Sequence, residues 1–239
     1  MFDKLFQYLD FTAEELVKNA VLISNEPFQD MIKFFQRITD QLKNPNFVQD
    51  KPQAVQGYNY IIVHAKRVCF YSALIAKGLK LSRKDYYEIA LSGLMHDLEK
   101  IYWPLDLLYG KKKDEITEDD WKRIFEHPIA TAVFVERLAR RQLSQNVINS
   151  ISQHHEDFDG KGYPKKISGA DISIGARIIR ISDSYDSITS PRSYKANVMT
   201  REEALADIRN KANKAYDPDL IKVFESVMTP DMQKQAGLI

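Results

Sequence analysis

The sequence has little cysteine, little histidine and no long apolar run, and these shortages exclude several classes of protein. Its 239 residues include one cysteine, Cys69, so no internal disulfide forms and a small disulfide-stabilised secreted scaffold is excluded. No run of about 18 apolar residues occurs, and the opening segment lacks the apolar core of a signal peptide. We therefore expect a cytoplasmic protein with no membrane span, in which Cys69 is a core residue.

The charges of the chain almost cancel. The 34 Lys+Arg and 33 Asp+Glu residues leave a formal net charge of +1, which argues against a broad surface for a DNA or RNA polymer. The length suits one domain with an extension. We expect residues 1–55 to form a helical extension and residues 56–239 to form the main domain. The extension is expected either to regulate or dimerise the protein, or to supply helices that cover the main domain.

Apolar residues recur at helical spacing along most of the chain, which predicts an all-α bundle without strands. Helices are expected over about 56–79, from Ser82 to near His96, from Thr117, anew from Pro128, over 172–188, from Thr200 and from Asp217. Loops are expected over 102–115 and 157–169. The lysine run 111–113 has two interpretations: it attracts a nucleotide, or it is an ordinary solvated loop.

Histidine is scarce, yet its distribution is informative. The five histidines are His64, His96, His127, His154 and His155, and the acids of interest are Asp97 and Asp183. Imidazole and carboxylate are good ligands for divalent Zn, Mn and Fe. Five imidazoles and two carboxylates exceed one tetrahedral site, and they suffice for two metals if Asp97 bridges them. From the residues alone, both a metal centre inside a bundle and ordinary structural histidines are open interpretations.

The motifs resemble those of a known family. The matching segments are HAKRVCFYSALIA, LMHDLEK, ITEDDWKRIFEHP, HHEDFDGKGYP and ARIIRISDSYDSITSPRSYK, in that order. Together they cover about Tyr60 to Tyr194 and resemble the HD-GYP domain, a branch of the HD superfamily of metal-dependent phosphohydrolases. The resemblance implies an HD-type helical bundle over residues 56–239, with all five histidines at ligand positions.

The resemblance also implies roles for individual residues. His64, His96, Asp97 and Asp183 would hold one metal, and Asp97, His127, His154 and His155 a second, with iron or manganese as the usual metals. Lys100 would contact the scissile phosphate, and Asp186 matches a further acidic position counted with the catalytic residues. Substrate contacts are expected from Gly160, Gly162 and Tyr163 of the Gly160–Pro164 loop, and from Arg192 and Lys195.

Three positions depart from the family pattern. Glu99 stands where glycine is common in the HD motif, and we expect it to narrow the site or repel an anionic substrate. Tyr60 stands where some members have a glutamate for a third metal, so we expect two metals. The segment Pro191–Tyr194 reads PRSY where DRPY is usual, which alters the edge of the cleft.

The resemblance implies an enzyme that hydrolyses a cyclic dinucleotide. In the leading hypothesis a metal-bridging hydroxide attacks phosphorus and opens cyclic di-GMP to linear pGpG, with slower hydrolysis to GMP. Glu99 and the altered PRSY segment motivate a second hypothesis, an HD phosphohydrolase acting on another cyclic dinucleotide or nucleotide. A third is a sensor that binds cyclic di-GMP without hydrolysing it. A regulatory partner or a second copy of the chain would bind through residues 1–55.

Overall fold

The computed structural model describes residues 52–109, 111–139, 143–190 and 198–229. The α-helices are α5 (Pro52–Gly78), α6 (Arg83–Met95), α7 (Leu105–Tyr109), α8 (Glu118–Leu138), α9 (Gln145–Ser152), α10 (Ile174–Thr189), α11 (Arg201–Asn210) and α12 (Pro218–Val227). Three short 3₁₀ helices complete them: η1 (Leu98–Tyr102), η2 (Lys113–Glu115) and η3 (Gly169–Asp171). The described residues contain no strand, so the all-α prediction is confirmed. Most of the expected extension, residues 1–51, lies outside the described residues.

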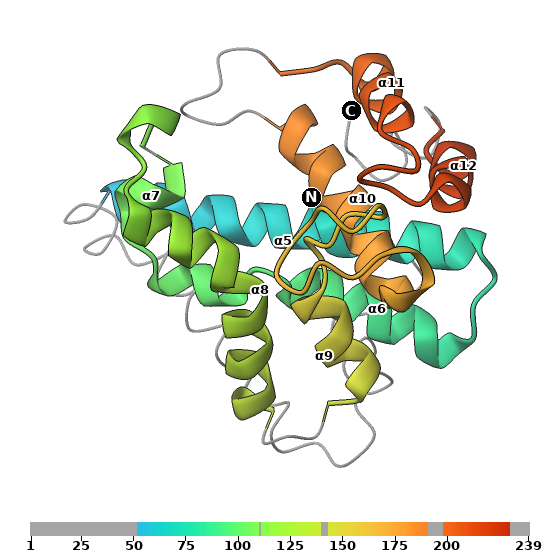
Figure 1. Ribbon diagram of the computed structural model, residues 1–239, viewed down its shortest axis with the longest axis horizontal. Helices are drawn as coiled ribbons and strands as arrows, with labels where there is room; N and C mark the ends of the chain where they lie inside the picture. Colours follow the sequence, from blue (N-terminus) through green and yellow to red (C-terminus); the bar gives the residue numbers. More distant parts are fainter. Residues whose placement is uncertain (1–51, 110, 140–142, 191–197, 230–239) are drawn as a thin grey trace.

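The bundle is organised around α5 (Figure 1). Helix α5 packs along α6 and also contacts α10 and α12, while α9 packs against α6, α8 and α10. The main core between them is formed by fully buried side chains such as Phe70, Ile75, Leu91, Ile178 and Phe224. Cys69 is buried in the same core, as expected. Within the described residues, no helix has both the length and the apolar composition needed to cross a membrane.

Side-chain caps explain where several helices begin. The Ser82 hydroxyl accepts from the Asp85 N–H, and Thr117 and Asp120 form a reciprocal capping box at the start of α8. Thr200 and Glu203 form the same motif at α11. These caps satisfy N–H groups that the first helical turn leaves without an internal partner. The predicted starts at all three places are confirmed.

Two local predictions are wrong. The segment 102–115 is not simply a loop, because α7 and η2 form within it. No new helix starts at Pro128; α8 passes through this residue without a break. Proline lacks the N–H that would bond to the carbonyl of Ile124, but the Nδ1 of His127 donates to that carbonyl at 2.7 Å instead. The side chain of the preceding residue therefore replaces the lost backbone bond.

Candidate metal centre and substrate pocket

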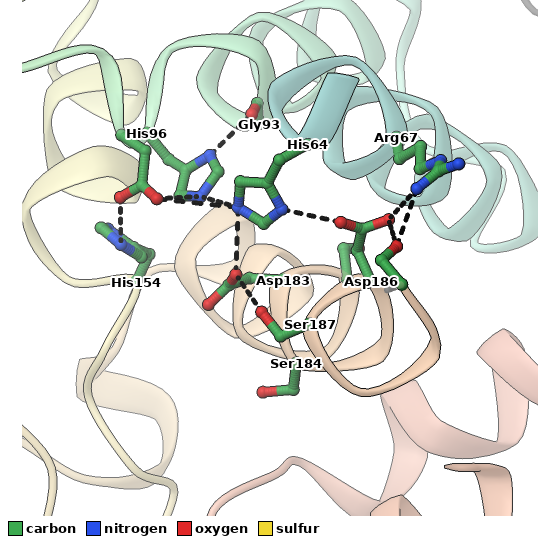
Figure 2. Close-up of polar contacts among 12 residues, drawn as sticks. His64, Arg67, Gly93, His96, His154, Asp183, Ser184, Asp186 and Ser187 are labelled. Atoms are coloured by element: carbon green, nitrogen blue, oxygen red, sulfur yellow. Dashed lines mark hydrogen bonds and ion pairs between the residues drawn. The ribbon is translucent and has the colours of Figure 1, made fainter. Parts of the chain in front are cut away.

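Five helices contribute to one cluster of histidine and aspartate side chains. The cluster consists of His64 on α5, His96 and Asp97 directly after α6, His127 on α8, His154 and His155 after α9, and Asp183 on α10. All of them are buried except His155, which is half-buried. Figure 2 shows His64, His96, His154 and Asp183 converging from separate ribbons. The structure thus brings together every residue that the motifs predicted as a metal ligand.

The Asp97 carboxylate lies between two groups of potential ligands. One group is His64, His96 and Asp97, the other is His127, His154 and His155, and in each group the donor atoms lie within 4.8 Å of one another. The Oδ2 atom of Asp97 is 3.6 Å from His64 Nε2 and 3.4 Å from His96 Nε2. Its Oδ1 atom is 3.2 Å from His127 Nε2 and 3.8 Å from His154 Nε2. One carboxylate therefore offers an oxygen to each group.

Backbone carbonyls fix the rings of three histidines. The Nδ1 atoms of His96, His127 and His154 lie 2.8, 2.7 and 2.6 Å from the carbonyl oxygens of Gly93, Ile124 and Ile151, respectively. A carbonyl only accepts hydrogen bonds, so each Nδ1 carries the proton. In the neutral ring, each Nε2 then directs a lone pair toward the centre. A hydrogen-bonded second nitrogen is typical of metal-binding histidines.

None of the three carbonyls has the backbone N–H donor that a carbonyl inside a regular helix would have, so each can accept from a histidine. Gly93 and Ile151 lie in the last turns of α6 and α9, where helix carbonyls have no internal donor. Ile124 precedes Pro128 by one helical turn, and proline supplies no N–H. Helix ends and a proline thus create the acceptors that orient these three histidines.

The facing histidine nitrogens fit a cation. The Nε2 atoms of His127 and His154 are only 3.2 Å apart. Burial lowers the pKa of both rings, with Lys100 adding to the effect on His127 and His96 to that on His154, so both rings are neutral. Two lone pairs then face each other, and Asp97 Oδ1, among the described residues, is buried without a hydrogen-bond donor. A divalent cation between these three atoms would satisfy all of them, so the residues present fit a metal site.

The two central carboxylates are held ionised. Burial opposes ionisation of Asp97, but the charges of His96 and Lys100 hold its pKa well below the usual range. Burial likewise opposes ionisation of Asp183, but the hydrogen bond from His64, together with the other nearby histidines, holds its pKa well below the usual range. Two ionised carboxylates beside imidazole nitrogens form a ligand set that favours a divalent cation.

Asp186 lies behind His64 and away from the cavity. Its Oδ2 atom accepts from His64 Nδ1 at 2.8 Å, and its Oδ1 atom accepts from the Ser190 hydroxyl at 3.0 Å. Arg67 approaches the same carboxylate at 3.7 Å, and Figure 2 shows the row of contacts from Arg67 to His64. Asp186 therefore orients the His64 ring and has no place on the cavity wall, although the motif predicted a catalytic acid.

A cavity of about 520 Å³ opens onto this centre. Its lining includes Asp97, Asp183 and three of the histidines. The remaining lining residues are Tyr60, Ile61, Lys100, Trp103, Leu107, Leu108, Lys111, Lys112, Ile116, Ile124, Tyr163 and Ser187. Lys100 donates to Asp97 Oδ2 at 2.7 Å, which places its ammonium beside the metal ligands. Of the predicted substrate contacts, Tyr163 reaches the cavity, whereas Arg192 and Lys195 lie outside the described residues, as does the PRSY segment.

Comparison with known proteins agrees with this geometry. The sequence matches the HD domain family over residues 45–220. This chain belongs to the HD domain family. Members are metal-dependent hydrolases, so the resemblance drawn from the motifs is confirmed.

Several characterised HD domain proteins are similar in sequence. A 3'3'-cGAMP-specific phosphodiesterase of Vibrio cholerae is 29% identical over 74% of this chain and 37% of its own length. A cyclic di-GMP phosphodiesterase of Pseudomonas aeruginosa is 31% identical over 77% of this chain and 43% of its own length. The chain thus spans less than half the length of these relatives.

Solved structures share the fold. An HD-GYP-type protein of Bdellovibrio bacteriovorus superposes with a TM-score of 0.58 at 20% identity, covering 90% of this chain and 77% of its own. A cyclic GMP-AMP phosphodiesterase of Vibrio cholerae gives a TM-score of 0.53 at 18% identity, covering 73% of this chain and 48% of its own. At these identities the likeness establishes the helical HD fold.

The GYP loop (Gly160–Pro164) of this HD domain packs against His155. The Tyr163 N–H donates to the His155 carbonyl at 3.0 Å, and the two rings stack with centroids 4.8 Å apart. Gly162 is buried against the backbone of residues 155–157, where there is no space for a side chain. Gly160 has a positive φ of 81° in the turn before it. Neither glycine lines the cavity, so these two predicted substrate contacts act on the shape of the loop.

Trp103 is a wall residue that the sequence did not identify. Its indole N–H donates to Glu99 Oε2 at 2.8 Å, and Lys100 Nζ lies 5.4 Å from the ring centroid. Glu99, the departure from the family glycine, does not line the cavity; its carboxylate holds the tryptophan that does. Glu99 therefore acts on the cavity wall through Trp103, and the expectation that it narrows the site stays a prediction. The pairing of the unusual Glu99 with a tryptophan one helical turn later was the available signal.

Replacing Pro128 with alanine is expected to stabilise the fold and weaken metal binding. The new N–H would compete with His127 Nδ1 for the Ile124 carbonyl, and a proline inside a helix costs about 3 kcal/mol. We expect the unfolding free energy of metal-free protein to rise by about 1–3 kcal/mol. Metal affinity is expected to fall roughly 10-fold or more, as when other hydrogen bonds that orient a metal-binding histidine are lost. Urea unfolding and metal titration measure the two effects. Pro218→Ala, at the first turn of α12, is the control, and unchanged metal affinity in Pro128→Ala would contradict the role.

Proposed function

We propose that this HD domain is a phosphodiesterase that hydrolyses cyclic di-GMP to linear pGpG, and pGpG more slowly to GMP. The observation that carries the proposal is the Asp97 carboxylate, which offers one oxygen to each histidine group at the base of the cavity. The cyclic dinucleotide phosphodiesterases similar to it in sequence support the substrate class.

We assign the centre two divalent cations, iron or manganese. His64, His96, Asp97 and Asp183 would hold one, and Asp97 with His127, His154 and His155 the other. When bound, such cations lower the pKa of a water nucleophile and withdraw electron density from phosphoryl oxygens. Asp97 would fix their separation, since its two oxygens face different groups. Asp186 would hold the His64 ring in the ligand orientation through the Nδ1 hydrogen bond.

Lys100 would act on the substrate itself. Its ammonium lies on the cavity wall 2.7 Å from Asp97 Oδ2, so a phosphodiester bound at the centre would lie beside a fixed positive charge. Charge that develops on the phosphoryl oxygens during attack would be offset there. Trp103, packed against Leu108 and Ile61, would keep that side of the cavity apolar and limit access of bulk water.

The test is turnover by metal-loaded protein. Protein purified without oxygen and loaded with Fe²⁺ or Mn²⁺ is expected to convert cyclic di-GMP to pGpG, followed by chromatography, and to cleave bis(p-nitrophenyl) phosphate. Metal-depleted protein is the control and should do neither. Cleavage of the synthetic diester without any hydrolysis of cyclic di-GMP would refute the substrate assignment.

A second candidate substrate has its own support. Sequence relatives include 3'3'-cGAMP-specific phosphodiesterases, and Glu99, which bonds the wall residue Trp103, departs from the common HD motif. The same assay with 3'3'-cGAMP separates the two activities by their kcat/KM ratio. Tight binding of either dinucleotide without product, in metal-replete protein, would instead favour a sensor.

A further inference from the structure

The cavity continues well beyond the metal centre. Asp97, Asp183 and three histidines (His64, His127 and His155) line one end of the cavity. Lys111 and Lys112 line it too, at some distance from these residues. Lys111 bonds to Asp120 in the first turn of α8, and His127 of the metal centre lies seven residues further along that helix. At 1.5 Å per residue the two points are about 10 Å apart along α8. The lysines therefore mark a second end of the cavity, about one nucleoside away from the metal ligands.

The wall between the two ends is apolar and aromatic. Trp103, Leu108 and Ile61 form a small buried cluster separate from the main core, and Leu107 and Ile124 pack against it. All five residues line the cavity. An apolar wall that includes an aromatic ring suits a nucleobase, because every base has a face that packs on such side chains.

The backbone that carries the lysines is fixed by several bonds. Lys111 Nζ lies 2.6 Å from Asp120 Oδ2 and 3.5 Å from Asp106 Oδ2, and its N–H donates to the Asp106 carbonyl at 2.7 Å. The Lys112 N–H donates to Glu115 Oε2 at 2.8 Å. The Lys111 ammonium thus forms ion pairs with two carboxylates, which hold the loop against α7 and α8.

Lys112 differs from its neighbour. Among the described residues, no carboxylate forms an ion pair with its ammonium, although its side chain lines the cavity. An ammonium with no ion-pair partner in the described part of the chain, at the end of an apolar wall, favours a ligand with hydrogen-bond acceptors. Guanine presents two acceptors, O6 and N7, on one edge and is the base that lysine most often reads, whereas adenine has an amino donor in place of O6.

We propose that Lys112 is a specificity residue that donates to the O6 and N7 acceptors of a guanine seated against Trp103 and Leu108. The inference rests on the proposed function, since it assigns one base of the cyclic dinucleotide substrate to this wall. The guanine edge at Lys112 and the scissile phosphate at Lys100 would then be read by different cations of one cavity. An exposed lysine contributes to guanine selectivity at the lower end of the range for base contacts, about 5- to 10-fold.

The experiment compares Lys112→Met with Lys222→Met, an exposed lysine on α12 that serves as the matched control. Cyclic di-GMP, cyclic di-AMP and bis(p-nitrophenyl) phosphate are the probes, with KM, or an inhibition constant where turnover is slow, as the readout. Lys112→Met is expected to raise KM for cyclic di-GMP about 5- to 10-fold at nearly constant kcat. Constants for the other two probes should change less than twofold, and Lys112→Arg should restore the wild-type KM.

An equal loss on cyclic di-AMP would assign Lys112 to a phosphate and overturn guanine recognition, and an unchanged KM for cyclic di-GMP would overturn any contact. In both cases wild-type turnover of cyclic di-GMP leaves the proposed function intact. Wild-type protein that cleaves only the synthetic diester, or no probe, would instead refute the proposed function and the guanine site with it.

Discussion

Asp97→Asn is expected to lower kcat/KM for phosphodiester hydrolysis by about 10³-fold, which corresponds to about 4 kcal/mol of transition-state stabilisation. The carboxylate presents one oxygen to His64 and His96 and the other to His127 and His154. An asparagine has one oxygen and one NH₂ group. Whichever way the amide turns, one histidine group faces a donor where a ligand oxygen stood, so one metal position is lost.

The metal content of the same variant distinguishes this cause from misfolding. We expect elemental analysis to find at most half the metal of the wild type, while the metal-free variant unfolds at a similar urea concentration. Asp217→Asn is the matched control: Asp217 is also buried and ion-paired, to Arg177, but it caps α12 away from the centre. Asparagine caps helices as well as aspartate does, so this control should keep its activity. Full metal content with near-normal activity in Asp97→Asn would show that the carboxylate does not bridge.

The clustering of the candidate ligands could be predicted from the sequence because most of them lie in short family motifs at a helix end or beside a proline. His96 with Asp97, and His154 with His155, follow the last turns of α6 and α9, where carbonyls are free to orient them. The local sequence therefore contains both the ligand and the group that positions it. His64 and Asp183 lie inside α5 and α10 without such a local signal, so the resemblance alone indicated them; Asp186, the partner of His64, lies 122 residues away in the chain.

The cavity wall could not be predicted in the same way. Trp103 directly follows η1, Leu107 lies in α7 and Lys112 precedes η2, all in a segment where the pattern indicated a loop. Their approach to the metal centre depends on tertiary packing of α7 against α5, which no local periodicity encodes. At Pro128 the error was the opposite one. Proline does remove a backbone hydrogen bond inside a helix, but His127 Nδ1 donates to the Ile124 carbonyl in its place, so the helix continues.

Gly162→Ala is expected to destabilise the metal-free protein by about 3 kcal/mol and to reduce metal binding. A Cβ at this position would overlap Asp157 N, lie 2.5 Å from the His155 carbonyl oxygen and 2.7 Å from Glu156 C. All three atoms belong to the backbone, so no flexible side chain can move aside, and overpacking of this kind costs roughly 1–3 kcal/mol or more. The loop must shift, and the His155 ring, which stacks on Tyr163, shifts with it.

Gly169→Ala separates this crowding from ordinary glycine effects. Gly169 also has a positive φ, 56°, but nothing lies within 4 Å of a Cβ built there. Its substitution should therefore cost only the left-handed backbone conformation, about 1–2 kcal/mol, and leave metal content unchanged. For a domain of this size, 3 kcal/mol corresponds to a fall in Tm of about 6–12 °C. If both variants melt together and bind equal metal, the close packing of Gly162 does not position His155, and the GYP loop must act on the substrate instead.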